Sequence, residues 1–510
     1  MNLEERAIQL GASVRYGVSV SKINSCTDFA IDANRAGRAD LSIAVLKPLS
    51  VVAASEPRIW QLLALAYRDE QQSENALAAF SRAAAQAPRN AQIAAGHASV
   101  TLESGAPSAL LFKRARDLAP NDPELLLSAV TALSVDGHPD VAEIVLARTV
   151  AANPAWVRGH EALAARRLTM TGADDFARTF ADGCADAPMD LALRLSWQRS
   201  LTLAKQFGAA QAVIDGGRSI FGALLEFDAA EANVATECGD DERAEALFTR
   251  AMAIDDPGTK ISHIRHCLRT GRIEQADGLA TAALQAAHAA SVWPYMSIIW
   301  RLLKDDRAIW LDGAPPMIAT VDLDFTVVEL DGLADTLRRL HTTRYHPAGQ
   351  SLRGGTQSEG ALFSRVEPEL QALRSKVVTA VRTYVDKLPA FDAKHPLLGT
   401  PRNEILFSGS WTVRLRAQGF HIHHTHPFGW ISSALYVALP SPLTQGATQA
   451  GRLQLGAPPP DLRVDLPAYA TIEPKPGRLV LFPSTMWHAT LPFDEGERLT
   501  VAFDVATPRR

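Results

Sequence analysis

The sequence predicts an α+β multidomain chain in which an N-terminal α-solenoid is followed by a β-sandwich or jelly roll. From about residue 20 to residue 300 the chain is rich in alanine and helical in period, with turns at regular intervals. From Ile405 onward it consists of short strand-like runs separated by Gly and Pro, which is typical of a sandwich or jelly roll. Pro315 and Pro316 mark the change between the two patterns.

Length and composition describe a folded protein with more than one domain. The chain has 510 residues, of which 47% are hydrophobic and 21% are charged. Its net charge of -5, without a basic block, argues against nucleic acid and anionic lipid as partners. The start is polar and acidic, unlike a secretory signal, and no apolar run has membrane-spanning length. Four separated cysteines without CxxC spacing predict reduced thiols and a cytoplasmic location.

The helical part contains a repeat of about 34 residues. A proline recurs at the end of successive units, at Pro88, Pro120, Pro154, Pro188 and Pro257, and Gly222 stands at the one missing break. The most complete unit reads Trp60-x-x-Leu63-Ala64-x-x-Tyr67, followed by Ala76, Phe80 and Ala83. This pattern resembles the tetratricopeptide repeat, in which small residues let paired helices approach and aromatic residues fill the space between them.

About seven such units predict a repeat array over residues 24–305, after an N-terminal segment of residues 1–23. Stacked helix pairs form a concave face that usually binds a peptide or another protein. We therefore expect a peptide or protein partner on that face. The alternative is that the array only supports the second domain or drives formation of a homodimer.

The second domain, residues 315–510, is expected to begin with a strand at 317–323 and two helices at 330–340 and 366–388. The glycine-containing run 349–357 is interpreted as a loop that shapes a site entrance. Its Gly354-Gly355 pair could cradle an anion. Seven further strands are expected, at 410–415, 420–426, 431–439, 453–455, 470–472, 478–482 and 499–505.

A histidine-rich strand ending at His426 is the clearest candidate for a functional site. Side chains on a strand alternate between its faces, so His424 and His426 are expected on one face and His421 and His423 on the other. His488, much later in the chain, would add a third imidazole. Three ligands on one side of a metal ion leave the other side open, as at a catalytic centre. All four cysteines precede this strand, so we expect no thiolate ligand.

These segments resemble a bacterial family of 2-oxoglutarate- and Fe(II)-dependent oxygenases. The resemblance covers about residues 315 to 507 and rests on runs that occur in the same order, namely 349–357, His424-Thr425-His426-Pro427, Gly429-Trp430-Ile431-Ser432 and 476–484. It implies a double-stranded β-helix (jelly roll) that uses Fe(II), 2-oxoglutarate and O2. The superfamily holds iron with His-x-Asp/Glu and a distal His, which implies His424, His426 and His488 as catalytic metal ligands.

One position departs from the wider superfamily, because His426 stands where an aspartate or glutamate is usual. The proline and the Gly-Trp-Ile-Ser run that follow fit the narrower family, which indicates a variant of that family. Two arrangements remain open at this point. His426 either binds the metal or lies beside a site formed by two histidines.

The resemblance also implies a cosubstrate site. A basic residue beyond the distal histidine pairs with the C5 carboxylate of 2-oxoglutarate in the superfamily, which gives this role to Arg498. Its planar guanidinium can grip a carboxylate with two hydrogen bonds. Thr500 has the same parity on its strand and can add a hydroxyl. Tyr436 is an even choice between core residue and cosubstrate contact, and Arg414 is a weaker candidate on the strand ahead of the histidines.

Three functions are compatible with these residues. The first is an oxygenase that hydroxylates a peptide or protein held by the repeat array. The second is a cupin-like metal protein that uses the three histidines without 2-oxoglutarate, and the third is a repeat scaffold with a non-catalytic sensor domain. Arg498 and Thr500 favour the first over the second, unless Arg498 forms a surface ion pair with Glu495 or Glu497.

Overall fold

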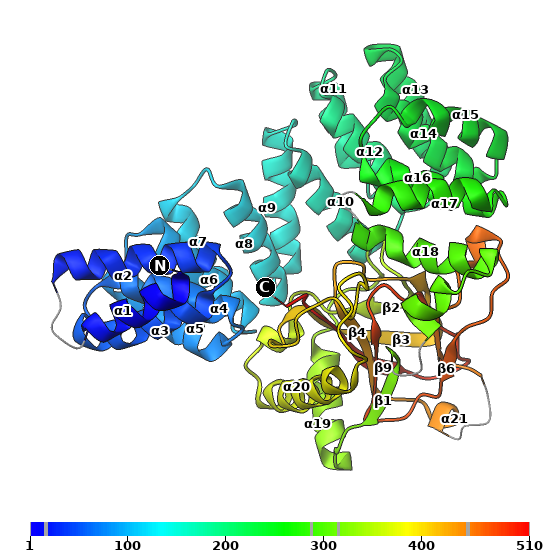
Figure 1. Ribbon diagram of the computed structural model, residues 1–510. Helices are drawn as coiled ribbons and strands as arrows, with labels where there is room; N and C mark the ends of the chain where they lie inside the picture. Colours follow the sequence, from blue (N-terminus) through cyan, green and yellow to red (C-terminus); the bar gives the residue numbers. More distant parts are fainter. Residues whose placement is uncertain (1, 15–18, 286–288, 314–316, 445–448, 509–510) are drawn as a thin grey trace. The chain divides into compact units, whose positions relative to one another are not determined.

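The computed structural model describes residues 2–14, 19–285, 289–313, 317–444 and 449–508 (Figure 1). Its contacts divide the chain into two compact units, the first formed by residues 1–146 and 360–374 and the second by residues 147–359 and 375–508. The boundary expected between residues 305 and 315 therefore lies within the second unit. Pro315 and Pro316, at which the sequence places the end of the array, lie outside the described residues.

The first unit consists mainly of helices. They are α1 (Leu3–Val14), α2 (Val20–Arg35), α3 (Ala39–Val52), α4 (Pro57–Asp69), α5 (Ser73–Gln86), α6 (Ala91–Glu103), α7 (Ala109–Leu118) and α8 (Pro123–Val135). In the pair α4–α5 the Trp60 indole donates a hydrogen bond to the carbonyl of Ala54, 2.8 Å away. A Cβ on Gly96 of α6 would lie 2.4 Å from the Phe80 ring. Glycine at this position therefore lets Phe80 fill the space between consecutive pairs.

The first helix of several pairs begins at a side-chain cap that the repeat supplies. The cap's oxygen accepts a hydrogen bond from a backbone N–H in the first helical turn at Asn90, Asp122, Asp190 and Asp256. A proline occupies the first turn of α4, of α8 and of a later helix, α16 (Pro257–Arg269). The recurring prolines and acidic residues therefore mark the places where one helix pair ends and the next begins.

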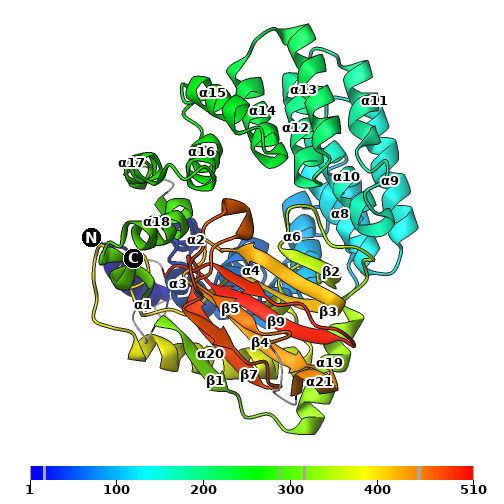
Figure 2. The same cartoon turned by 90° about the vertical axis from the view of Figure 1, so that its right-hand side faces the viewer.

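Helix pairs continue in the second unit, and Figure 2 shows them following one another in an arc. They are α10 (Val157–Thr171), α11 (Arg178–Asp186), α12 (Leu191–Leu203), α13 (Phe207–Phe221), α14 (Leu225–Cys238), α15 (Asp241–Ala251), α16, α17 (Ile273–Leu284) and the closing helix α18 (Ala289–Leu303). Helix α9 (Pro139–Ala152) spans the division between the units. The predicted α-solenoid is confirmed. None of the helices in the described ranges is both long and apolar enough to cross a membrane.

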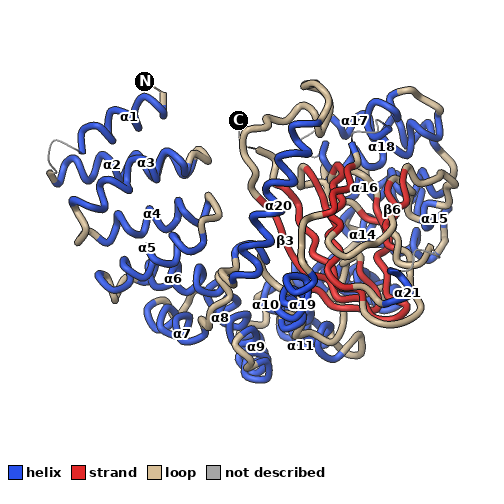
Figure 3. Tube along the Cα trace, turned by 90° about the horizontal axis from the view of Figure 1, so that it is seen from below, coloured by secondary structure: helices blue, strands red, loops and turns tan. Residues whose placement is uncertain are grey.

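The β-strands of the second unit form a curled antiparallel sheet, shown in red in Figure 3. They are β1 (Ala319–Asp322), β2 (Leu352–Gln357), β3 (Phe407–His424), β4 (Ile431–Ala438), β5 (Leu453–Leu455), β6 (Ala470–Ile472), β7 (Arg478–Pro483), β8 (His488–Thr490) and β9 (Arg498–Val505). The first half of β3 pairs with β9, and its end pairs with β8. Strand β3 thus joins two layers, β1-β7-β4-β9-β3 and β3-β8-β5-β6. This pairing is that of a double-stranded β-helix, so the predicted fold class is confirmed.

Two short strands were not expected from the sequence. Strand β8 has three residues, which is too few to show an alternating pattern. Strand β2 lies in the run that was interpreted as a loop, and it pairs with β3. A Cβ on Gly355 would lie 2.4 Å from the backbone oxygen of Arg414, and Gly354 has a φ of 69°. The two glycines therefore permit the close approach of two strands, a role that the sequence interpretation missed.

Helices α19 (Val327–Arg339) and α20 (Pro368–Lys387) confirm the two helices expected in the C-terminal part of the chain. Helix α19 begins with a capping box, in which Thr326 and Glu329 bond reciprocally, and it contacts β4. Shorter turns complete the described structure, namely Ile309–Gly313, Leu362–Ser364, α21 (Ser441–Thr444) and Pro460–Leu462.

Helices α16 to α18 share a hydrophobic core with loops of the β-helix. Trp487 is buried there, with its ring 5.5 Å from that of Tyr295 on α18. The Trp487 indole donates a hydrogen bond of 2.9 Å to the carbonyl of Pro294, and Arg301 donates to the carbonyl of Gly456. The end of the array and the β-helix are thus packed together within the second unit. Whether the two predicted domains can be separated near residues 305–315 stays a prediction for limited proteolysis.

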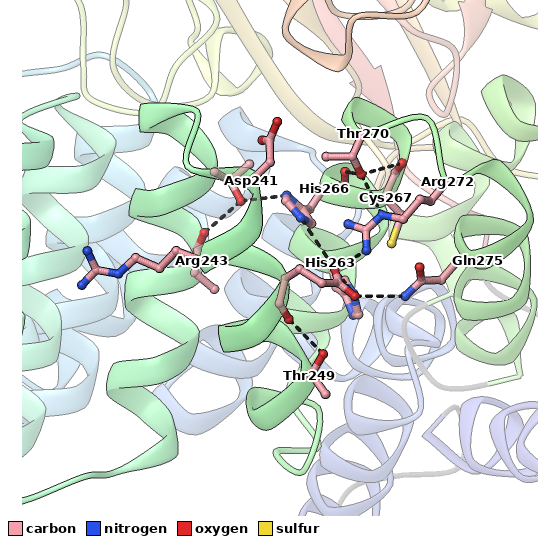
Figure 4. Close-up of polar contacts among 12 residues, drawn as sticks. Asp241, Arg243, Thr249, His263, His266, Cys267, Thr270, Arg272 and Gln275 are labelled. Atoms are coloured by element: carbon pink, nitrogen blue, oxygen red, sulfur yellow. Dashed lines mark hydrogen bonds and ion pairs between the residues drawn. The ribbon is translucent and has the colours of Figure 1, made fainter.

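A polar cluster is buried within helices α15 to α17 of the array (Figure 4). His263 and His266 of α16 are 4% and 0% exposed, and Phe248 stacks on His263 with 5.0 Å between ring centroids. Their Nε2 atoms lie 3.5 and 3.6 Å from Oε2 of Glu245, which is also 2.5 Å from Nη1 of Arg272. Burial lowers the pKa of both imidazoles, so the folded array holds them in the neutral form near pH 7.

We expect these two histidines to make the array sensitive to acid. Their folded pKa values lie below the value of about 6.5 for an exposed histidine. The unfolded chain therefore takes up protons first, and the stability that neutral His263 and His266 contribute is complete above about pH 6.5 and lost below it. Urea unfolding at about pH 7 and about pH 5 measures this loss. The double variant His263→Gln, His266→Gln should lose less stability on acidification than the parent chain, whereas the exposed His138→Gln should behave like the parent. Equal pH dependence in all three proteins would contradict this account.

Candidate active site

Three histidines of the β-helix converge at the end of β3. His424, the last residue of β3, lies opposite His488 of β8, and their ring centroids are 4.0 Å apart. His426, in the turn after β3, has its ring 5.0 Å from His424 and 5.1 Å from His488. One ring nitrogen of each residue lies within 4.8 Å of the others. Within the described ranges, this is the only group of three or more potential metal ligands with such spacing.

The histidines meet for a reason that differs from simple alternation along a strand. The register of β3 shifts between His421 and His424. As a result, the His421 ring stacks beside that of His424, with 6.0 Å between centroids and 20° between planes. The prediction that His421 faces away from His424 is therefore wrong. His426 lies beyond the end of the strand, so its position is set by the turn rather than by the pleat.

The hydrogen bonds of the three rings leave Nε2 as the atom available for a ligand bond. Nδ1 of His424 lies 2.8 Å from the carbonyl of Ile422, and Nδ1 of His488 lies 3.1 Å from that of Met486. A carbonyl can only accept, so these Nδ1 atoms carry the proton and Nε2 keeps its lone pair. Burial also lowers the pKa of His424 and His488, which favours the neutral, metal-binding form.

The donor set fits a divalent iron ion. Imidazole nitrogens suit iron, and three of them on one side leave positions for other ligands. No cysteine lies in the β-helix. The Ser351 hydroxyl lies 3.1 Å from Nε2 of His424, so it would exchange this hydrogen bond for another when a metal takes that nitrogen. His424, His426 and His488 are therefore the residues that would hold the ion.

Arg498 is enclosed in the β-helix without a counter-charge. It is 1% exposed, and its Nε has no hydrogen-bond partner among the residues that the structure describes. Glu497 pairs instead with Arg338, at 2.8 Å, and with Arg414. The alternative of a surface ion pair for Arg498 is therefore wrong. Burial lowers the pKa of Arg498, and a buried cation without an anion is costly, so this pocket is complementary to an anionic ligand.

Tyr436 and Thr500 lie on the same face of the sheet as Arg498. Tyr436 and Val413 both pair with Thr500, and opposed residues of antiparallel strands point the same way. Tyr436 is fully buried, and its ring lies 5.0 Å from the Arg498 guanidinium carbon. The Tyr436 hydroxyl also lacks a hydrogen-bond partner within the described part of the chain. An anion at Arg498 could therefore accept a further hydrogen bond from Tyr436.

Arg414 is not part of this group. It lies opposite Leu499, which alternates with Arg498 and Thr500 and so points to the other face. Its guanidinium pairs with Glu497. The structure thus brings six of the seven candidate residues to one interior and places Arg414 outside it. The face of the sheet on which Arg414 lies follows from its pairing with Leu499 of β9, which the sequence does not reveal.

Arg498, Tyr436 and Thr500 share that interior with the histidines. Tyr436 and Phe482 belong to one buried cluster, and the Phe482 ring lies 4.8 Å from that of His488. The Trp411 ring lies 5.5 Å from that of His426 on another side. Aromatic side chains therefore flank His488 and His426, whereas Arg498 and Tyr436 are buried in the interior of the sheet.

A groove of about 1080 Å³ in the second unit is lined by His423 and by Ile422, whose carbonyl bonds to His424. One wall consists of single faces of α10, α12, α14 and α16, including Ala192, Arg199 and Asn233. The other wall includes Ile422 and His423 at the end of β3, and it also contains Gly349, Gln350, Arg353 and the turn Pro459–Asp461. Ser351, which contacts His424, lies between these wall residues in sequence. The groove thus connects the repeat helices with the rim of the histidine cluster.

The sequence interpretation missed Asp504, Ser351 and the groove. Asp504 lies on β9 with the same parity as Arg498 and Thr500, so strand alternation could have identified it. Ser351 lies in the run 349–357, but no pattern distinguishes it from its neighbours. The groove residues come from helices far apart in the sequence and could be identified only from the fold.

Part of the chain matches a sequence family model, and some solved structures are similar to parts of it. Residues 409–504 match the sequence model of the family described as "Putative 2OG-Fe(II) oxygenase". No curated protein matches the chain. Among solved structures, a prolyl-4-hydroxylase from Pseudomonas putida is 17% identical, covering 38% of this chain and 93% of its own with a TM-score of 0.27. A 2OG-Fe(II) oxygenase family oxidoreductase from Burkholderia pseudomallei is 13% identical, covering 38% and 89% with a TM-score of 0.26.

A further solved structure is similar to the helical part. A tetratricopeptide repeat protein from Parabacteroides merdae is 18% identical, covering 46% of this chain and 93% of its own with a TM-score of 0.30. The family match includes His424, His426, His488 and Arg498. Residues 409–504 thus match the model of a 2OG-Fe(II) oxygenase family, in a chain whose preceding part contains an array of helical repeats.

Proposed function

We propose that this chain is a 2-oxoglutarate- and Fe(II)-dependent oxygenase that hydroxylates a peptide or protein bound in the groove beside the repeat helices. The observation that carries the proposal is the pairing of two features in one interior. One is a group of three imidazoles with nitrogen lone pairs available, and the other is a fully buried arginine that lacks an anion.

In this proposal the chain's own residues bind and orient the cosubstrate. Arg498 receives the C5 carboxylate of 2-oxoglutarate through its guanidinium, and Tyr436 donates a hydrogen bond to the same group. Thr500, 4% exposed on the same face, supports that end of the pocket with its hydroxyl. His424, His426 and His488 hold Fe(II) at the other end. With O2, bound iron and 2-oxoglutarate would supply the oxidising chemistry, and the side chains around them would limit its contact with water.

The groove is the proposed site of the peptide substrate. Each of its repeat helices contributes one face, and small side chains such as Ala192, Ala229 and Ser262 leave room for a polypeptide. Polar groups along the same faces can bond the backbone of an extended chain. The wall that adjoins Ser351 would place one substrate residue next to the histidine cluster. The repeats thus recruit the chain to be hydroxylated as well as supporting the fold.

Filling the groove should block hydroxylation without disturbing the metal or the cosubstrate. Ala192 is exposed on α12 and lines the groove, whereas Ala209 is exposed on α13 and does not. We expect Ala192→Trp to lose at least about ten-fold in peptide hydroxylation while Ala209→Trp keeps it, because the indole occupies the substrate's path. The assay is the gain of an oxygen atom in a peptide mixture, measured by mass spectrometry. Equal hydroxylation by both variants would place the substrate elsewhere.

A further inference from the structure

A carboxylate from β9 lies directly behind the ring of His426, which is in the turn after β3. Oδ1 of Asp504 lies 2.8 Å from Nδ1 of His426, on the side of the ring away from Nε2. Asp504 is 8% exposed and lies on β9, opposite Ser432 of β4. Of the three histidines, His426 has this carboxylate contact, whereas His424 and His488 bond to backbone carbonyls. The histidine at the unusual position thus has a different kind of support.

The surrounding residues hold this carboxylate in place. The Ser432 hydroxyl donates to Oδ1 of Asp504 at 2.6 Å and lies 3.0 Å from the Ser484 hydroxyl. The backbone N–H of His426 donates to the carbonyl of Ser484 at 2.9 Å. A Cβ on Gly429 would lie 2.7 Å from the Ser484 hydroxyl and 3.1 Å from Cβ of Asp504, so glycine is needed there. Two of the runs that carry the family resemblance, Gly429 to Ser432 and the one ending at Ser484, therefore contact Asp504 or hold its partners in place.

We propose that Asp504 is a positioning residue that supplies, through His426, the negative charge that an aspartate or glutamate ligand would supply directly. Three neutral imidazoles would leave the full charge of a divalent ion uncompensated in a partly buried site. A carboxylate that accepts the Nδ1 proton fixes the ring orientation and makes Nε2 a stronger donor. The missing acidic ligand is thus replaced by a His426–Asp504 pair. This inference rests on the proposed metal site.

The test compares metal binding by Asp504→Asn with that by a matched control, Glu497→Gln. Both variants remove one carboxylate from the β9 region, but Glu497 pairs with Arg338 and Arg414, outside the site. Fe(II) affinity, measured against a competing chelator, should fall about 10- to 100-fold for Asp504→Asn and stay unchanged for Glu497→Gln. Asp504→Glu should recover part of the loss, because it restores the charge with altered geometry.

A spectroscopic readout separates this role from a purely structural one. With saturating Fe(II) and 2-oxoglutarate under anaerobic conditions, the charge-transfer band of Asp504→Asn should move to shorter wavelength, because a less electron-rich iron gives up charge less easily. Thermal unfolding of the metal-free proteins shows whether the variant is folded. A further variant, His426→Asp combined with Asp504→Asn, should bind Fe(II) better than Asp504→Asn alone, since it returns the carboxylate to the ligand position.

The outcomes are distinguishable. If the parent chain binds no Fe(II), the proposed function fails. If the parent binds Fe(II) and a folded Asp504→Asn variant has the same affinity and the same band, the metal site stands and the role of Asp504 is overturned. If Asp504→Asn does not fold, Ser432→Ala becomes the test, because it removes the hydroxyl that bonds to Asp504. This variant should also lower the affinity for Fe(II). Unchanged affinity and an unchanged band for Ser432→Ala would then count against the proposal.

Discussion

Replacement of Arg498 by alanine is expected to weaken 2-oxoglutarate binding by ~30-fold to several thousand-fold. The reason is that the C5 carboxylate would enter a buried pocket without its cation, which costs about 2–5 kcal/mol in comparable charge pairs. Arg498 is 1% exposed and has no carboxylate partner in the described structure, so the charge lost is not compensated by a neighbouring group. Titration of the Fe(II)-loaded protein with 2-oxoglutarate under anaerobic conditions measures the change.

Two further variants control this experiment. Arg498→Lys should recover part of the lost affinity, because lysine keeps the positive charge. Recovery should be incomplete, because lysine lacks the planar guanidinium that forms two hydrogen bonds to a carboxylate. Arg414→Ala removes an arginine from the opposite face of the same sheet region and should leave the titration unchanged. Fe(II) affinity should change little in any of the three proteins. A normal titration curve for Arg498→Ala would remove the main reason to prefer an oxygenase over a cupin-like metal protein.

Loss of a histidine from the cluster should have the largest effect on the metal. His424→Ala and His488→Ala are each expected to lower Fe(II) affinity by more than ~100-fold, since removal of a residue that only supports a ligand already costs about 10- to 100-fold. The rings of His424 and His488 are 4.0 Å apart, so each variant opens the site on the same side. Elemental analysis after desalting reports the iron retained per chain.

Variants of His423 and His426 provide a control and a ligand exchange for this experiment. His423 lines the groove rather than the cluster, so His423→Ala should retain iron and serves as the matched control. His426→Asp should keep part of the iron, because a carboxylate is the usual ligand at that position. Full iron content in His424→Ala or His488→Ala would mean that the ligands are assigned wrongly. Loss of iron in His423→Ala would mean that the histidine-rich segment acts through its fold instead.

Much of the architecture could be predicted from the sequence because it depends on local chemistry. Prolines and acidic caps at fixed spacing define the helix pairs, and the cap at Asp122 is an example. Strand β9 is long enough to show alternation, with Arg498, Thr500 and Asp504 separated by apolar residues. Strand β8, with three residues, is too short for any periodic signal. Strand β2 was not predicted, because Gly354 and Gly355 are typical of a loop. In the structure the two glycines allow β2 to lie close to the backbone of β3.

The candidate site was predictable to a similar extent. The spacing of His424 and His426 identified the pair, but strict alternation misplaced His421, because the register shift within β3 has no sequence signature. Asp504 was missed, although its parity with Arg498 was readable, because nothing in the linear pattern pairs it with His426. The contacts of Arg414 depend on which strand lies beside it, which the sequence does not state.

Three expectations from the sequence stay predictions. They are a cytoplasmic location, a homodimer formed through the array and the independence of the two predicted domains. The shared core around Trp487 makes the last of these the most informative to test, because a fragment that begins after residue 315 would expose that indole. Tryptophan fluorescence of such a fragment would report the exposure directly.

The most direct test of the central claim is the absorption of the wild-type chain on anaerobic addition of Fe(II) followed by 2-oxoglutarate. We expect one iron to bind per chain, and a metal-to-ligand charge-transfer band then to appear and to saturate with 2-oxoglutarate. Glutarate, which lacks the 2-oxo group, should give no band. Iron binding without a band at saturating 2-oxoglutarate, or no iron binding at all, would contradict the assignment of this chain as a 2-oxoglutarate-dependent oxygenase.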